Sequence, residues 1–158
     1  MSTEAIPKMY DSLIPSLALD GAAKAIEFYK TVLGAEELMR MGMPGGDKIA
    51  HAELKIRGHV FMLGDACPEM GAKAPTQDGP MPPFSVMIYY ADVDAVFAKA
   101  MENGAKVVMP PTDMFWGDRY AKFIDPFGHL WGIGTHVRDV SPEECAKAME
   151  EWGKAPQE

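Results

Sequence analysis

Two stretches of the chain share one pattern of apolar and polar positions. Each begins with a short apolar run, at residues 12–19 and 83–90, which predicts a β-strand. Each run is followed by apolar residues at every third or fourth position, as in an amphipathic helix packed on a core. The predicted stripes are Ile26, Tyr29 and Leu33 in a helix over residues 21–33, and Val93, Val96, Phe97 and Ala100 in a helix over 93–103.

Both helices carry start and stop signals. Asp20 and Asp92 precede the helices, where a carboxylate accepts hydrogen bonds from the first backbone N–H groups. Gly34 and Gly104 follow them, at the position where a left-handed residue commonly ends a helix. Three strand-like segments come after each helix. Each half therefore predicts a β-α-β-β-β module.

The two modules are related by a constant offset of 70 residues, which also brings Gly58-His59 onto Gly128-His129. A period this long indicates a duplicated module rather than a solenoid. We expect module one at about 11–66, a Pro- and Gly-rich linker at about 67–82 and module two at about 83–136. Ser141-Pro142-Glu143-Glu144 then predicts a C-terminal helix over about 141–152. The fold class is α+β.

Composition narrows the kinds of partner. The chain has 158 residues, 47% of them hydrophobic, enough for the core of one domain. Its formal charge of −8, without a basic run, disfavours nucleic acid and anionic membrane surfaces as partners. The N-terminus has no apolar signal core, so we expect a soluble, cytoplasmic protein. Cys67 and Cys145 have no metal-binding spacing and are expected to be free thiols.

The paired module resembles the vicinal oxygen chelate superfamily, which includes glyoxalase I, bleomycin-resistance proteins and extradiol dioxygenases. AIEFYKTVLGAEEL and DPFGHLWG are similar to its first-helix and final-hairpin signatures. GDRYAKFIDPFGHLWGIGTHVRDVSPEE is similar to the PhnB-like branch. The resemblance implies two curved mixed sheets around a cavity, with the helices outside. The cavity would form either within one chain or between the two chains of a dimer. We expect the protein to be a homodimer.

In metal-using members, the ligands lie on the first and last strands of each half. The resemblance carries these positions onto Ile14, Met62, Ser85 and Gly132, with Pro15 or Phe84 as alternatives for the first strands. None of these is the histidine, glutamate or aspartate that a divalent cation needs. We therefore expect neither a metal nor another cofactor.

A structural role explains the histidines of the final hairpin more simply than metal binding does. His129 follows the turn sequence at 125–128, and His59 recurs at the same position of module one, so both are expected to be structural. Trp131 should point away from the Gly132 position, into the core. The role of His136, at the end of the last strand, stays open.

The hairpin at 49–63 carries the sharpest candidate chemistry. Arg57-Gly58 predicts a two-residue turn, which would pair Glu53 with Met62. Glu53 and His51 would then face the cavity, where Glu53 can act as a general base and His51 can orient a proton. Alternatively, this face is solvated and Glu53 is a surface charge.

A second candidate is DMFWGDRY at 113–120. Trp116 beside Arg119 suits a planar or anionic ligand. Alternatively, an Asp118–Arg119 pair holds the loop and the aromatic residues cover an edge. Other expected cavity residues are Ser85, Met87 and Tyr89, which alternate along the first strand of module two, and Ile14, Met62 and Gly132 at the metal-ligand positions.

Two functions follow from these patterns. The first is a PhnB-like, metal-free protein that binds a small apolar or aromatic molecule. The second is an enzyme of the lyase, isomerase or dioxygenase type with a non-standard site at Glu53 and His51. A structural or interaction role has only the acidic charge in its favour. The sequence does not identify the ligand or substrate.

Overall fold

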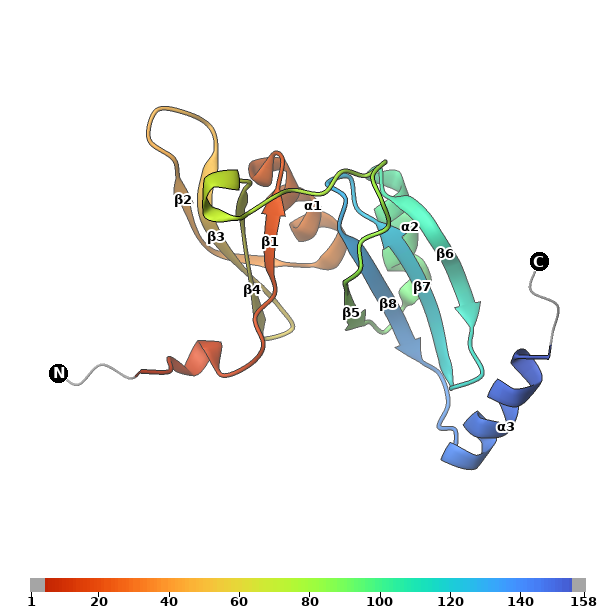
Figure 1. The fold of residues 1–158 in the computed structure, drawn as a ribbon. Helices are drawn as coiled ribbons and strands as arrows, with labels where there is room; N and C mark the ends of the chain where they lie inside the picture. Colours follow the sequence, from red (N-terminus) through yellow and green to blue (C-terminus); the bar gives the residue numbers. More distant parts are fainter. Residues whose placement is uncertain (1–4, 155–158) are drawn as a thin grey trace.

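The protein, seen in a computed structural model that describes residues 5–154, consists of two four-stranded sheets with their helices (Figure 1). Sheet one has the order β1-β4-β3-β2, in which β1 is parallel to β4 and the other pairs are antiparallel. Its elements are β1 (Ser16–Leu19), α1 (Ala22–Leu33), β2 (Glu36–Gly42), β3 (Ile49–Ile56) and β4 (His59–Asp65). Two single-turn 3-10 helices lie outside the sheets, η1 (Lys8–Tyr10) before β1 and η2 (Pro68–Met70) in the linker.

Sheet two repeats this topology in the order β5-β8-β7-β6, with β5 parallel to β8. Its elements are β5 (Ser85–Tyr89), α2 (Val93–Glu102), β6 (Lys106–Asp113), β7 (Asp118–Ile124) and β8 (Leu130–His136). The two sheets lie side by side, and the linker crosses from one to the other (Figure 1). The α+β class and the repeated β-α-β-β-β module are confirmed. The boundaries drawn for the modules and the linker stay predictions.

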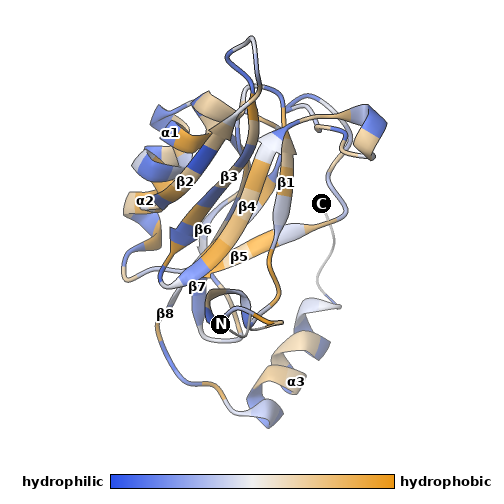
Figure 2. Cartoon of the chain, turned by 90° about the vertical axis from the view of Figure 1, so that its left-hand side faces the viewer, coloured by the Kyte–Doolittle hydropathy of each residue, from blue (hydrophilic) through white to orange (hydrophobic). Residues whose placement is uncertain are grey.

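The C-terminal helix is also confirmed, as α3 (Pro142–Trp152). Ser141 and Glu144 form the predicted capping box at its start. None of its residues is buried, and it stands away from both sheets (Figure 2). No helix in residues 5–154 is long and apolar enough to cross a membrane.

The two modules begin their helices differently. Asp92 caps α2 as predicted, accepting a hydrogen bond of 3.0 Å from the backbone N–H of Ala95. The prediction that Asp20 caps α1 is wrong, because the parallel pairing of β1 and β4 brings Asp65 to that helix end. Asp65 accepts from the N–H groups of Gly21 and Ala22 at 2.9 and 3.1 Å. Burial acts to raise the pKa of Asp65, but hydrogen bonds from the backbone N–H groups of Ile49, Ala22 and Gly21 outweigh it and hold the pKa below its usual value.

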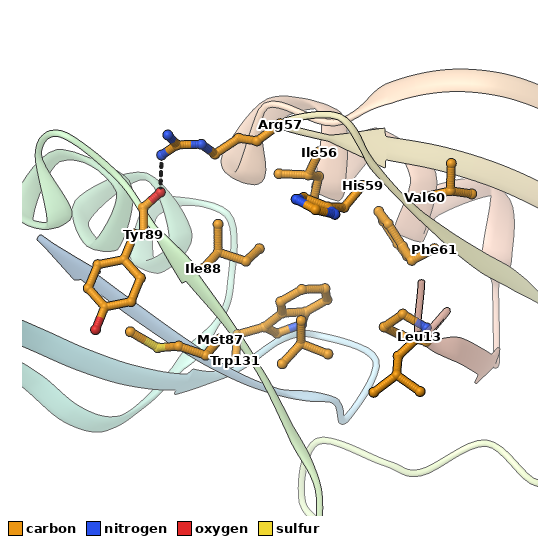
Figure 3. A pocket seen from close by; sticks show the side chains of 12 residues that line it. Leu13, Ile56, Arg57, His59, Val60, Phe61, Met87, Ile88, Tyr89 and Trp131 are labelled. Carbon is orange, nitrogen blue, oxygen red and sulfur yellow. Dashed lines mark hydrogen bonds between the residues drawn. The ribbon is translucent and has the colours of Figure 1, made fainter. Parts of the chain in front are cut away.

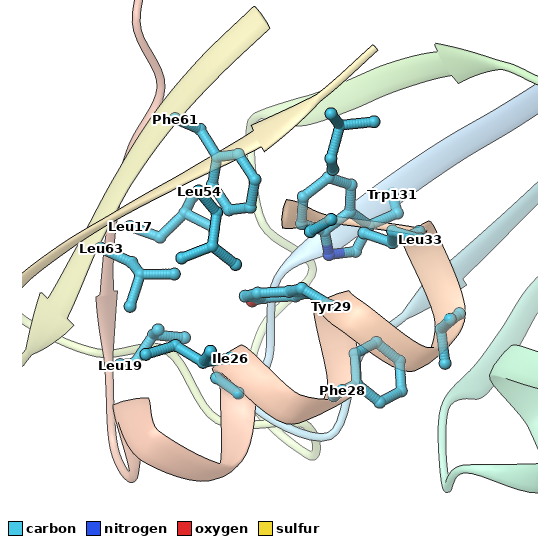
Figure 4. Close-up of a cluster of buried hydrophobic side chains, with 14 of the residues drawn as sticks. Leu17, Leu19, Ile26, Phe28, Tyr29, Leu33, Leu54, Phe61, Leu63 and Trp131 are labelled. Atoms are coloured by element: carbon cyan, nitrogen blue, oxygen red, sulfur yellow. The ribbon is translucent and has the colours of Figure 1, made fainter. Parts of the chain in front are cut away.

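The two helices share one hydrophobic core. They lie together on one side of the sheets, and α1 packs between its own sheet and β8 (Figures 2 and 4). Trp131 is 1% exposed and its ring centroid lies 5.3 Å from that of Tyr29. The fully buried Asp125 accepts 2.8 Å hydrogen bonds from the Tyr29 hydroxyl and the Trp131 indole N–H. Trp131 is therefore a core residue, as predicted.

Polar contacts also fasten module two to module one. The Nε2 atom of His129 lies 2.9 Å from the backbone oxygen of Ala18 on β1. The Tyr90 hydroxyl donates to the carbonyl of Leu33 at 2.9 Å. The structural role expected for His129 is thus a hydrogen bond between modules.

Each sheet has one face against an α-helix and one face that no α-helix of residues 5–154 covers, which we call its open face. The open face of sheet one carries Met39, Met41, His51, Glu53 and Met62. The open face of sheet two carries Met87, Tyr89, Asp118, Tyr120, Lys122, Gly132, Gly134 and His136.

The predicted hairpin between β3 and β4 is confirmed. Arg57 and Gly58 have the positive φ angles of a two-residue turn, 51° and 87°, and Glu53 pairs with Met62.

Candidate functional site

The four positions at which the resemblance places metal ligands do not bring together side chains that could hold a metal ion. Ile14 lies just before β1, and Met62 lies opposite Ser16. At Gly132, an added Cβ atom would come within 2.9 Å of the Tyr120 hydroxyl and 3.0 Å of the Met87 sulfur. In the described part of the chain, no group of three His, Cys, Asp or Glu residues is placed to hold a metal ion. The side chains present do not fit a divalent cation.

A cluster of three polar side chains, the Glu53 cluster, lies on the open face of sheet one. Glu53 is only 9% exposed, and its Oε1 atom lies 3.2 Å from Nε2 of His51. The hydroxyl of Tyr10, on η1, donates to both carboxylate oxygens at 2.9 and 2.8 Å. Glu53 is therefore not the solvated surface charge of the alternative interpretation. The sequence analysis missed Tyr10, because it lies outside both modules.

Tyr10 acts as the hydrogen-bond donor of this cluster. The hydrogen bond to Glu53 and, to a smaller extent, burial raise the pKa of its phenol above the ordinary value. The phenol therefore stays protonated and keeps both carboxylate oxygens engaged. A ligand proton could reach Glu53 only after Tyr10 had moved aside.

A second cluster, the Asp118 cluster, lies on the open face of sheet two. Asp118 is 5% exposed and accepts hydrogen bonds from the Tyr89 hydroxyl at 2.6 Å and the Trp116 indole N–H at 3.0 Å. Its other oxygen lies 2.9 Å from Nδ1 of His136. Burial acts to raise the pKa of Asp118, but these hydrogen bonds outweigh it, so the pKa lies below its usual value. Asp118 is an ionised carboxylate at neutral pH.

His136 has an acid on each side. Its Nε2 atom lies 3.0 Å from the exposed carboxylate of Asp139. The hydrogen bonds with Asp118 and then Asp139 raise the pKa of the imidazole. The chain after β8 is held by Gly117, whose carbonyl accepts from the N–H groups of Val137 and Arg138 at 2.9 and 3.0 Å. Gly117 has a φ of 99°, and a Cβ there would collide with the Arg138 carbonyl.

Two glycines of β8 let the Asp118 cluster form. Gly132 and Gly134 leave this stretch of the open face without side chains, and side chains from the neighbouring strands lie across it. The Tyr120 hydroxyl covers Gly132, and the ring of Tyr89 passes Gly134 to reach Asp118. Sequence reasoning placed Trp116 and Tyr89 in the site but missed Asp118 and Tyr120. The sequence signal that could have indicated them is the alternation Gly132-Ile133-Gly134, which leaves room on one face of β8 for side chains of the neighbouring strands.

Aromatic rings continue from this cluster into the loop before β7. The ring centroids of Trp116 and Tyr120 lie 6.0 Å apart, and those of Phe115 and Trp116 lie 5.1 Å apart. Both pairs are edge-to-face, which leaves ring surface available to a planar ligand.

Arg119 points to the other side of sheet two. Its guanidinium donates to both carboxylate oxygens of Asp94, on α2, at 2.6 and 2.7 Å, and to Asp113 at 3.0 Å. The alternative Asp118–Arg119 pair is wrong, because Asp118 pairs with His136. Ligand binding by Arg119 stays a prediction, and its contacts give it no support. Ser85, at the start of β5, is half-buried and lies opposite Leu130.

A groove of about 460 Å³ runs between the modules beside β5 (Figure 3). Arg57 closes one end by donating to the backbone oxygen of Tyr89. Of the predicted ligand-binding residues, Met87 and Tyr89 line it. The other lining residues are Leu13, Pro15, Ile56, Arg57, His59, Val60, Phe61, Val86, Ile88 and Trp131.

A second hollow, of about 510 Å³, lies between sheet one and the linker. Polar groups from both modules and from the linker reach it, namely His51, His129 and Lys73. Because His51 also contacts Glu53, the Glu53 cluster adjoins this hollow. The structure thus offers one mostly apolar and one more polar candidate site.

Comparison with known proteins agrees with this architecture. The model of the Glyoxalase/Bleomycin resistance protein/Dioxygenase superfamily matches residues 15–133, and the chain belongs to that superfamily. An uncharacterized protein of Mycobacterium bovis is 43% identical over 145 residues, which are 90% of this chain and 94% of the relative.

Solved structures show the same fold. TioX from Micromonospora sp. ML1 has 27% identity and a TM-score of 0.61, over 80% of this chain and 99% of TioX. A PhnB protein from Bacillus cereus has 17% identity and a TM-score of 0.63, over 79% and 99% of the two chains. TnmS3 from Streptomyces sp. CB03234, described as an antibiotic binding protein, has 24% identity and a TM-score of 0.53, over 80% and 97%.

Proposed function

We propose that this chain is a PhnB-like member of the superfamily that binds a small apolar or aromatic molecule without a metal ion. The observation that carries the proposal is the state of the Gly132 position, where the Tyr120 hydroxyl and the Met87 sulfur occupy the space of a metal-ligating side chain. A thioether and a phenol replace the carboxylate that a hard cation would need.

The groove beside β5 is the proposed binding site. Its volume of about 460 Å³ falls within the usual range for small-molecule sites, and most of its lining is apolar. Met87 and Tyr89 are 40% and 45% exposed on a strand that is otherwise half-buried, so a ligand there would cover apolar surface. The antibiotic-binding relative TnmS3 makes this use of the fold plausible by analogy.

A homodimer in the cytoplasm is part of the proposal. Met39 and Met41, on the open face of sheet one, are 38% and 54% exposed. Contact with the open face of a second copy would remove this apolar surface from water. Light scattering should give twice the monomer mass, and the free thiols Cys67 and Cys145 suit a reducing compartment.

Elemental analysis and a thermal-shift screen test the binding proposal together. The purified protein should contain no stoichiometric divalent metal, and aromatic compounds should raise its melting temperature more than aliphatic compounds of equal size. Met87→Asp should abolish this shift. The matched control is Met149→Asp, because Met149 is also an exposed methionine but lies on α3. This variant should keep the shift in melting temperature. Stoichiometric metal, or equal shifts in both variants, would contradict the proposal.

The Glu53 cluster favours one alternative, a lyase or isomerase that uses Glu53 and His51. The supporting observation is the buried carboxylate with a histidine 3.2 Å away, next to a hollow of about 510 Å³. Glu53→Gln should then abolish turnover of a substrate while binding is kept. Retained turnover would exclude Glu53 as the base.

A further inference from the structure

We propose that the Asp118 cluster binds the hydroxyl group of an aromatic ligand at Nε2 of His136 and holds it as a phenolate. This inference rests on the proposed function and adds the chemical class of the ligand, an aromatic molecule with an acidic hydroxyl group. His136, Trp116 and Tyr120 do not line the groove beside β5, but Tyr89 lines the groove and donates to Asp118, so it connects the groove with the cluster.

A buried carboxylate orients the imidazole of His136. Nδ1 of His136 lies 2.9 Å from a carboxylate oxygen of Asp118, whose side chain is almost fully buried. Tyr89 and Trp116 fix that carboxylate from two other elements, at 2.6 and 3.0 Å. A buried aspartate behind Nδ1 fixes the ring and favours its protonated form, as in other histidine–aspartate pairs that accept protons.

A ligand can also reach Nε2 of this imidazole. Its partner, Asp139, is fully exposed on the chain after β8, so the side chain of Asp139 can turn into water at little cost. A ligand hydroxyl that replaces it meets the open face of sheet two, where the rings of Trp116 and Tyr120 lie 6.0 Å apart. The hydroxyl of one ligand would thus meet Nε2 of His136, while its aromatic ring would meet the neighbouring rings of Trp116 and Tyr120.

The proton balance is simple. When His136 is neutral, the ligand O–H bond breaks, its electron pair stays on oxygen and the proton forms an N–H bond at Nε2. When His136 is already protonated, the ligand loses its proton to water. Both routes give the same imidazolium–phenolate pair. The groups that face the imidazole are Asp118 on β7, Asp139 after β8 and, through Asp118, Tyr89 on β5 and Trp116.

Two matched probes test the inference, 4-nitrophenol and 4-nitroanisole. They differ in one hydroxyl, and nitrophenol changes its visible absorption when it ionises. At a pH where free nitrophenol is mostly neutral, the bound form should show the phenolate band, and it should bind at least about tenfold more tightly than nitroanisole. His136→Asn keeps a donor for Asp118 and removes Nε2. In this variant the phenolate band should vanish while nitroanisole still binds.

Lys24→Asn, at an exposed position of α1 outside both clusters, is the control and should change nothing. Melting curves of both variants will show that they are folded. If the two probes bind equally, or the band persists in His136→Asn, the inference is overturned and metal-free binding stands. If neither probe binds to the wild-type protein, the inference and the proposed aromatic ligand both fail.

Discussion

The Glu53 and Asp118 clusters have similar partners. In each, a carboxylate on an open face is largely buried, accepts a hydrogen bond from a tyrosine hydroxyl and lies beside a histidine. Duplication did not produce this likeness. The register places Lys122 where module one has Glu53, so the two clusters are built from different positions. Each open face acquired its own buried acid.

The clusters differ in where their partners come from. Tyr10 reaches Glu53 from η1, which lies outside the module, and His51 lies two residues away on the same strand. The partners of Asp118 come from β5, β8 and the loop before β7. The Glu53 cluster is therefore closed by a separate segment, whereas the Asp118 cluster is part of sheet two. This difference predicts how far each cluster stabilises the fold.

The largest effect is expected for Asp118→Ala. Three side-chain donors would lose their common acceptor at a position that is 5% exposed, so the free energy of unfolding should fall by about 2–4 kcal/mol. Urea denaturation at pH 7 measures this loss. Asp118→Asn is the control and should recover part of it, since the amide oxygen still accepts. A loss below about 1 kcal/mol would show that water replaces the carboxylate.

Glu53→Ala should cost less, about 1–2 kcal/mol by the same measurement. Glu53 has two side-chain partners, and both His51 and Tyr10 remain partly accessible to water, so their donors can be solvated after the change. A loss as large as that of Asp118→Ala would break the comparison, because it would make the Glu53 cluster equally integral to its sheet.

Much of the fold was predictable because it depends on local patterns. The apolar spacing gave the helices, and the positive φ angles of Arg57 and Gly58 follow from their place in a two-residue turn. The start of α1 was not predictable in this way. Its cap, Asp65, is more than forty residues away in the chain and reaches the helix only through the parallel pairing of β1 and β4.

The candidate sites were predictable only in part, and most completely within one hairpin. Strand alternation placed Glu53, His51 and Met62 on one face, and they lie there. Alternation could not show that Tyr10 covers Glu53, because no periodicity links η1 to β3. It also could not show that Arg119 is held by Asp94 on α2, since that contact depends on how the helix packs on the sheet.

Tyr10→Phe isolates the segment that closes the Glu53 cluster. Removing the hydroxyl deletes both hydrogen bonds to the carboxylate and leaves Glu53 and His51 in place. The loss of stability should be about half that of Glu53→Ala or less, because Glu53 can then bind water. Amide hydrogen exchange in residues 8–10 should rise while β3 stays protected. If β3 also lost protection, the cluster could not be described as closed from outside the sheet.

The smallest effect is expected from His136, which Asp118 and Asp139 contact, and it appears in the pH dependence of stability. The pKa of His136 is raised in the folded protein, by Asp118 first and Asp139 second. Protonation therefore favours folding below the unfolded-state pKa of ~6.5, and this contribution is lost as the pH rises through the higher folded value. The stability difference between wild type and His136→Gln should accordingly shrink as the pH rises above ~6.5. Salt should reduce the part due to Asp139 more than the part due to buried Asp118. A difference that stays constant across this range would mean that His136 does not bind its proton more tightly in the folded state. The contrast between the two clusters would then depend only on the stability losses of Asp118→Ala and Glu53→Ala.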